Sequence, residues 1–205
     1  MFDTIKKYLH IFLRDFIQFP WYIVTHPIDG FYEMKRYERG LVKVALFYLV
    51  IESTIGILQY RYTGFMFNNF NPTTFNYIRQ ILVTLSPYLV FILANWAITT
   101  LMDGKGRLKD IFNVVGYALF LKVIISLFNI ILSNVITFDE AFVFYGLETI
   151  AYSIMILMVF MGIMNIHEYS LSKTILTIII TIVVIFVIIF LLLLAFSLIQ
   201  QIYVF

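Results

Sequence analysis

The chain has no cysteine among its 205 residues, and only 13% of its residues are charged. The missing cysteine excludes a disulfide framework, a thiolate metal site and a cysteine nucleophile. A net charge of only +2 argues against a nucleic-acid partner. Soluble proteins carry about 25% charged residues, so no water-soluble fold of this size could cover a sequence that is 62% hydrophobic. The composition therefore predicts an integral membrane protein surrounded by the lipid bilayer.

Five stretches are long and apolar enough to cross the bilayer, which takes about 20 residues as an α-helix. The predicted spans are residues 41–60, 80–102, 111–136, 142–166 and 174–199. The polar connection 103–110 contains Gly104 and Gly106, which we expect to take positive φ. The third and fourth spans are joined by so few residues (137–141) that they must be antiparallel neighbours. The predicted fold class is all-α: an integral membrane bundle of five transmembrane helices preceded by an N-terminal amphipathic interfacial helix.

Basic residues are distributed unequally between the two ends of the predicted bundle. One end receives eleven of them: Lys6, Lys7, Arg14, Lys35, Arg36, Arg39, Lys43, Lys105, Arg107, Lys109 and Lys173. The other end receives only Arg61 and Arg79. Because lysine and arginine accumulate in cytoplasmic loops, we expect the N-terminus in the cytoplasm and the C-terminus on the extracytoplasmic side.

The N-terminal region differs from the rest of the chain. Apolar side chains recur at helical spacing from Phe2 to Phe19, with basic side chains elsewhere on the wheel. This pattern predicts a helix in the plane of the lipid headgroups that ends before Pro20. We expect residues 1–39 to form a cytoplasmic amphipathic segment and residues 40–205 the transmembrane domain. The expected headgroup contacts are Lys6, Lys7, Lys35, Arg36 and Arg39.

Ionisable residues inside the spans are costly in lipid and are functional candidates for that reason. Glu52 and Lys122 both lie about 16 Å from the cytoplasmic ends of their spans. Because they match in depth and are opposite in sign, we predict an ion pair between the first and third spans. Glu148, about 9 Å below the outer surface, is a poorer match for Lys122. The pair either fixes helix packing or serves transport or a proton relay; snorkelling, or pairing with a partner protein, is the remaining alternative.

Polar residues also recur along two spans at the spacing of one helix face. The stripes are Lys122, Ser126, Asn129 and Ser133 in the third span and Thr84, Tyr88, Asn95 and Thr99 in the second. They either hydrogen-bond across closed interfaces, at about 0.6–2 kcal/mol per bond, or line a wet path. A wet path through only five helices would be narrow and would require a homo-oligomer.

The outer connection, residues 61–78, is rich in aromatic and asparagine residues. Aromatic faces beside amide groups suit a sugar-binding surface. The same composition is typical of an interfacial aromatic belt with an Asn-Pro turn. The candidate external ligand surface is Tyr62, Phe65, Phe67, Asn68 and Asn69.

Sequence signatures of enzymes are missing: there is no Gly-x-Ser-x-Gly, no His-Glu-x-x-His and no Walker loop. Histidine and carboxylate residues from three connections could converge at the cytoplasmic end, but no pair has metal-ligand spacing. They are His26, Asp29, Asp103, Asp110, His167 and Glu168. We therefore expect no catalytic residue, no metal site and no cofactor.

Six separate segments occur in an order that is typical of one family. They are His26-Pro27-Ile28-Asp29-Gly30-Phe31 with Met34-Lys35-Arg36 and Arg39-Gly40, Tyr62-Thr63-Gly64-Phe65, Ala94-Asn95-Trp96, Thr99-Thr100-Leu101-Met102-Asp103-Gly104, Gly116-Tyr117-Ala118-Leu119, and Tyr169-Ser170-Leu171-Ser172-Lys173-Thr174. From about residue 20 onward, the chain resembles the bacterial branch of the Yip1 domain family. The resemblance implies five membrane helices with a cytoplasmic N-terminus, in the bacterial cytoplasmic membrane. It also implies carbohydrate ABC-transporter permeases as gene-cluster neighbours.

Three functional hypotheses follow. The leading one is a non-enzymatic accessory or scaffold subunit of a bacterial cytoplasmic-membrane complex, associated with a carbohydrate ABC transporter. Its partners would be the lipid bilayer and other membrane subunits, such as ABC-transporter permeases. The second is a small transporter or channel that uses Glu52 and Lys122, and the third is a membrane-shaping protein that acts through its amphipathic helix.

Overall fold

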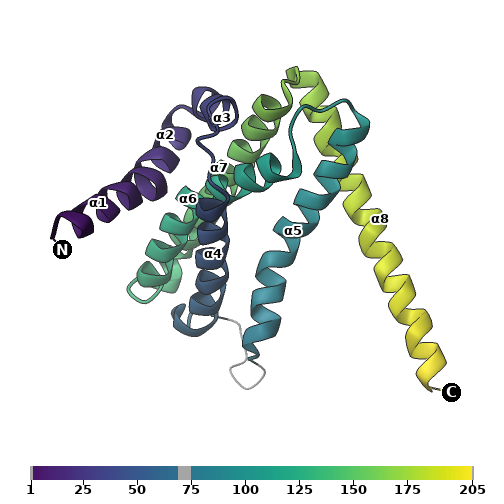
Figure 1. The fold of residues 1–205 in the computed structure, drawn as a ribbon. Coiled ribbons are helices and arrows are strands. Elements are labelled where there is room, and N and C mark those ends of the chain that lie inside the picture. The colour runs from purple at the N-terminus through teal and green to yellow at the C-terminus, as the bar shows by residue number, and fades with distance from the viewer. Residues whose placement is uncertain (1, 69–74, 205) are drawn as a thin grey trace.

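The computed structural model describes residues 2–68 and 75–204, with the side chains of residues 6, 9–68 and 75–201. Helices α4 to α8 are each long and apolar enough to cross a membrane, which confirms the predicted all-α bundle of five spans (Figure 1). The helices are α1 (Phe2–Leu13), α2 (Phe19–Thr25), α3 (Pro27–Arg36), α4 (Val42–Tyr62), α5 (Tyr77–Leu101), α6 (Leu108–Leu132), α7 (Ala141–His167) and α8 (Leu171–Val204).

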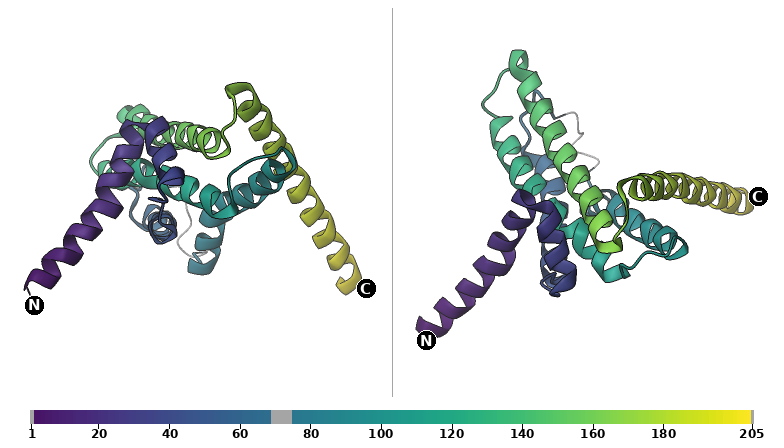
Figure 2. Two further views of the ribbon diagram at one scale, coloured as in Figure 1. Left: turned by 45° about the horizontal axis from the view of Figure 1, so that its top comes forward. Right: turned by 90° about the horizontal axis from the view of Figure 1, so that it is seen from above.

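Helix α6 is the centre of the bundle. It packs against α4 on one side and α7 on another, while α5 packs on α4 and α8 packs on α5 (Figures 1 and 2). The short 3-10 turn Phe138–Glu140 connects α6 to α7 as antiparallel neighbours, as predicted. Gly116 of α6 lies directly against Ala45 of α4, where a Cβ would overlap the Ala45 backbone. The missing side chain therefore permits the close approach of α4 and α6.

Helix α6 ends at Leu132, four residues before the predicted end of the third span. The Asn134 side chain donates to the carbonyls of Ile130 (2.9 Å) and of Tyr62 (2.8 Å). An asparagine that bonds nearby backbone carbonyls competes with helix continuation. The contact also attaches the end of α6 to the connection that follows α4.

The N-terminal helix does not end before Pro20, so that prediction is wrong. A π-helical turn at Arg14–Gln18 joins α1 to α2 in one continuous rod (Figure 1). Pro20 has no N–H, so the Phe16 carbonyl lacks its usual donor four residues on. The Tyr48 hydroxyl of α4 donates to this carbonyl instead. A tertiary contact thus compensates for the proline.

The apolar side of this rod contacts the bundle. The Phe47 ring of α4 lies edge-on to the rings of Phe12 and Phe16, with centroids 6.1 and 5.0 Å away. Farther along, Ile23 and Phe31 are fully buried, as α2 packs on α6 and α3 packs on α7. Part of the face that we expected in the headgroup layer therefore anchors the N-terminal region to the spans.

Candidate functional site

The centre of the bundle contains one pair of opposite charges. The Lys122 ammonium of α6 donates to Oε1 of Glu52 on α4, so the ion pair predicted from matched depth is present. Both residues are 2% exposed. A charge buried in this way is tolerated only when it is paired, because burial removes its hydration.

Two tyrosines complete the surroundings of the pair. The Tyr88 hydroxyl of α5 donates to the same Glu52 oxygen at 3.0 Å, and the Lys122 ammonium lies 4.7 Å from the centroid of the Tyr152 ring of α7. Four helices therefore meet at one charged contact. Glu52 Oε2 and Ser126 Oγ are buried and have no hydrogen-bond partner among the described residues.

The two predicted polar stripes do not face each other along their length. Every member of the α6 stripe is buried, from Lys122 to Ser133. The α5 stripe divides: Tyr88 reaches α4, whereas Asn95 reaches α8. Among the described residues, the stripes connect through Glu52, which accepts from both Lys122 and Tyr88. This arrangement is a set of interhelical bonds and not two facing rows of polar groups.

A second polar contact lies nearer the end of the bundle that carries few basic residues. Glu148 Oε1 of α7 accepts hydrogen bonds from Gln59 Nε2 and Asn129 Nδ2, both at 3.2 Å. Asn129 Nδ2 also donates to the Phe144 carbonyl at 3.1 Å. Glu148 thus connects α4, α6 and α7 and does not compete with Glu52 for Lys122.

Helix α8 is attached to α5 by short polar side chains. Asn95 Nδ2 donates to Thr181 Oγ1 at 3.2 Å, and Thr177 Oγ1 donates to Met102 Sδ at 3.3 Å. Thr174, Thr177 and Thr181 are fully buried. The three threonines lie on one face, one turn apart, and define the contact side of α8.

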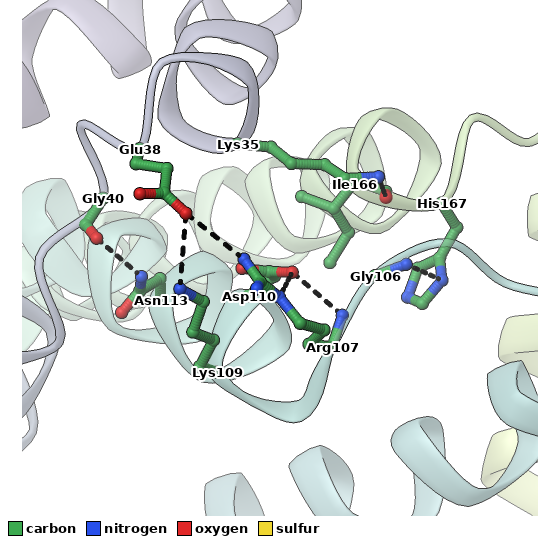
Figure 3. A network of polar contacts seen from close by, with 10 residues as sticks. All are labelled: Lys35, Glu38, Gly40, Gly106, Arg107, Lys109, Asp110, Asn113, Ile166 and His167. Atoms are coloured by element: carbon green, nitrogen blue, oxygen red, sulfur yellow. Dashed lines mark hydrogen bonds and ion pairs between the residues drawn. The ribbon is translucent and has the colours of Figure 1, made fainter.

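The basic end of the bundle, where α3 meets the α5–α6 and α7–α8 connections, holds a polar network (Figure 3). Lys35 of α3 donates to the Ile166 carbonyl at the end of α7. Asp110 accepts from the backbone N–H of Arg107 at 2.9 Å and caps α6. Asn113 donates to the Gly40 carbonyl at 3.1 Å. These contacts fix the segments before and after the spans to the helix ends.

The glycines of the α5–α6 connection do not take positive φ, so this prediction is wrong. Asp103 takes it instead, with φ of 56°. Gly104 and Gly106 lie against His167, which a Cβ at either position would strike, and Gly106 N–H donates to His167 Nδ1 at 3.2 Å. The glycines are required by close packing around this buried imidazole. Its Nε2 has no partner among the described residues.

Burial changes the pKa of Lys35 and of Tyr169, which lie outside the spans at this end. It lowers the pKa of Lys35, an effect that Glu168 and Asp110 partly oppose. It raises the pKa of the Tyr169 hydroxyl, which donates to the Met102 carbonyl at 3.0 Å. On the surface, the hydrogen bond from Lys105 lowers the pKa of Glu168. The described residues include no group of three histidine or carboxylate side chains that could hold a metal ion.

The candidate external ligand surface is only partly assembled. Phe67 is buried, with its ring stacked 4.8 Å from Phe144, whereas Phe65 is 85% exposed. Tyr62 and Asn68 line a cavity of about 580 Å³ together with Phe65. Asn69 lies outside the described residues. The role of this surface in binding a ligand stays a prediction.

The predicted headgroup residues have different environments. Lys6 and Arg36 are exposed, whereas Arg39 pairs with Glu33. Lys35 is directed into the bundle, toward Ile166. The Lys7 side chain is not among those described. Lipid contact by these residues stays a prediction.

The sequence does not indicate which side chains are the hydrogen-bond partners in these interhelical contacts. Tyr88 was placed in a polar stripe but not beside Glu52, and Gln59 was not singled out. The Tyr48 contact with Phe16 could have been anticipated in part, because Pro20 marks a carbonyl without its helical donor. The identity of that donor depends on which helix packs alongside, which sequence spacing does not reveal.

Fold and site together define a class: a polytopic helical membrane protein whose buried charges are paired inside the bundle. Within this class the chain belongs to the Yip1 domain family, because the profile of the Yip1 domain matches residues 21–194. Neither the curated proteins nor the solved structures contain a match to the chain. The matched range includes α2 from Trp21 onward, all of α3 to α7, and α8 as far as Leu194.

Proposed function

We propose that this protein is a non-enzymatic scaffold or accessory subunit of a membrane complex, and that α8 is its docking helix. The observation that carries the proposal is the position of α8. After Thr181 no residue is buried as far as Gln201, and the helix runs away from the other spans (Figures 1 and 2). Glu52, Tyr88, Lys122, Asn129 and Glu148 of the other spans bond to one another across helices, which suits a structural role.

The length of α8 supports docking. Its 34 residues extend about 51 Å at 1.5 Å per residue, whereas the hydrocarbon core of a bilayer is about 30 Å thick. Thr177 and Thr181 attach its first turns to Met102 and Asn95 at the α5 side. The rest presents large apolar side chains such as Phe186 and Phe190. Such a face suits the apolar helix of another membrane subunit. The resemblance to the bacterial branch makes a carbohydrate ABC-transporter permease the first partner to test.

The proposed location is the bacterial cytoplasmic membrane, with the N-terminus in the cytoplasm and the C-terminus outside. In this proposal residues 1–39 form the cytoplasmic segment and residues 40–205 the membrane domain. The support is the concentration of basic residues at the end of the bundle that carries α3. Reporter fusions after Gln201 and before Met1 test it: activity of an extracytoplasmic reporter only at the C-terminus is expected, and both ends on one side would overturn it.

Affinity purification in mild detergent with mass spectrometry of co-eluting chains tests the docking proposal. The expected result is a membrane subunit in fixed ratio, lost in a Phe186→Ala/Phe190→Ala variant. The matched control is Phe128→Ala/Phe142→Ala, which truncates two exposed phenylalanines on α6 and α7. Equal loss in both variants, or elution of the chain alone, would overturn the docking role of α8.

The transporter alternative is favoured by one specific observation: near Lys122, Glu52 Oε2 and Ser126 Oγ are buried and find no partner in the part of the chain that the structure describes. Buried polar atoms without partners are uncommon and occur at functional sites. A Lys122→Met variant in proteoliposomes separates the two functions. In both cases the variant is less stable, so flux is compared in the fraction that stays folded: a transporter would lose its flux there, whereas a scaffold would show no change in any flux.

A further inference from the structure

A cation-lined groove lies where the N-terminal rod passes α3 and the beginning of α4. It consists of two adjoining cavities of about 390 and 380 Å³. Arg14, Phe19 and Arg39 line both of them, and Lys43 lines the first. None of these side chains takes part in the contacts among the spans that the proposed scaffold role uses.

A π-helical turn of the rod lies beside the groove. Arg14 begins the π-helical turn, which rotates the following residues relative to a regular α-helix. The Tyr48 contact with the Phe16 carbonyl holds this turn against α4. Turns of this kind are frequent at functional sites. The groove is therefore a consequence of how the rod is anchored.

The walls carry three basic side chains and the carboxylates of Asp15 and Glu33 above an apolar floor. Arg14 bonds Asp15 at 2.9 Å, and Arg39 pairs with Glu33 while its guanidinium lies 5.1 Å from the centroid of the Phe19 ring. These carboxylates orient the two guanidinium groups and leave further N–H donors. Lys43 has no ion-pair partner within the described part of the chain. The groove thus carries one uncompensated positive charge.

The position of the groove indicates which anion it meets. Lys43 is the second residue of the first membrane-spanning helix, and the ends of spans lie at the level of the lipid headgroups. On the rod itself, Leu13, Ile17 and Trp21 are exposed apolar side chains, which suit the adjoining acyl region. This position favours an anion that is attached to lipid.

We propose that this groove binds the phosphate of an anionic phospholipid headgroup, with Arg14, Arg39 and Lys43 as its ligands. Arginine presents planar pairs of donors to phosphate oxygens, and lysine adds a point charge. Phe19 and Leu41 contact the glycerol end of the lipid. The proposal is independent of the scaffold role, because it concerns the opposite side of the chain from α8.

Native mass spectrometry of the purified full chain, titrated with short-chain phosphatidylglycerol, tests the proposal. The expected result is one tightly retained lipid. Its affinity should fall about fivefold in Lys43→Gln and about 25-fold in Arg39→Gln/Lys43→Gln, as each basic residue near a surface contributes roughly one fivefold step. The matched control, Lys105→Gln/Lys109→Gln, removes two charges from the same end and should retain the lipid.

Two outcomes would overturn the proposal. Equal loss of lipid in the control would mean diffuse attraction to the whole basic end. Displacement of the lipid by millimolar inorganic phosphate would mean a site for free phosphate. Loss of lipid in Lys43→Gln could not be attributed to misfolding, because the Lys43 side chain has no ion-pair partner among the described residues.

Discussion

Helices α6 and α8 are both apolar enough to cross a membrane, yet they occupy opposite environments. In the most apolar 18-residue stretch of each helix, 67% of residues are buried in α6 and 6% in α8. Helix α6 contains Asn113, Lys122, Ser126 and Asn129, whereas no charged residue follows Lys173 in the chain. In lipid, then, the helix with polar groups is the interior one, because its polar atoms need partners that lipid cannot supply.

The largest expected effect comes from breaking the charge pair that α6 makes. Glu52→Gln or Lys122→Met alone should lower the free energy of unfolding by about 3–5 kcal/mol, because each leaves a buried charge without its partner. The double variant should cost less than either single change. Denaturation with SDS in mixed micelles measures all three, and additive losses would show that the two charges are not coupled.

Close packing of α6 gives the next effect. Gly116→Ala places a Cβ on the Ala45 backbone and should cost about 1–3 kcal/mol of stability, as overpacking does. Gly146→Ala on α7 is the control, since a Cβ there meets nothing within 4 Å. It should stabilise by up to about 1 kcal/mol through helix propensity. Equal behaviour of the two variants in thermal melting would argue against a close contact between α4 and α6.

Weakening the attachment of α8 should have a smaller effect. Asn95→Leu removes the hydrogen bond to Thr181 and should cost about 0.6–2 kcal/mol. The loss should appear as a broader distance distribution between spin labels at Arg79 on α5 and Gln201 on α8. The absence of native cysteine makes such labelling straightforward. An unchanged distribution would mean that apolar contacts alone hold the two helices together.

The smallest effect concerns the connection between α7 and α8. Because burial raises the pKa of Tyr169, its hydroxyl stays protonated in the folded state when the unfolded chain ionises near pH 10. Its stabilising contribution is complete below about pH 10 and is lost as pH rises through the raised pKa. Tyr169→Phe should therefore reduce the fall in melting temperature between pH 9 and 11. Tyr37→Phe, at an exposed position, should leave that fall unchanged.

The sequence predicted the span count and the Glu52–Lys122 contact, because hydrophobic length and helical rise are local quantities. The wrong predictions concern positions where a second segment of the chain makes the deciding contact. The rod continues past Pro20 because Tyr48 supplies a donor, and Gly104 is required by the His167 side chain and not by its own φ. No residue spacing within one helix reveals such partners.

By itself, the sequence determined that this chain forms five helices long and apolar enough to cross a bilayer. Each helix satisfies its own backbone hydrogen bonds, so its ability to span depends on the length of its apolar stretch. Tertiary structure alone decided that α6 is central, that Tyr88 joins the charge pair and that α8 leaves the bundle. The reason is that burial in lipid depends on which faces pack closely together. Which faces pack together depends on small residues such as Gly116 and on side chains from several helices at once.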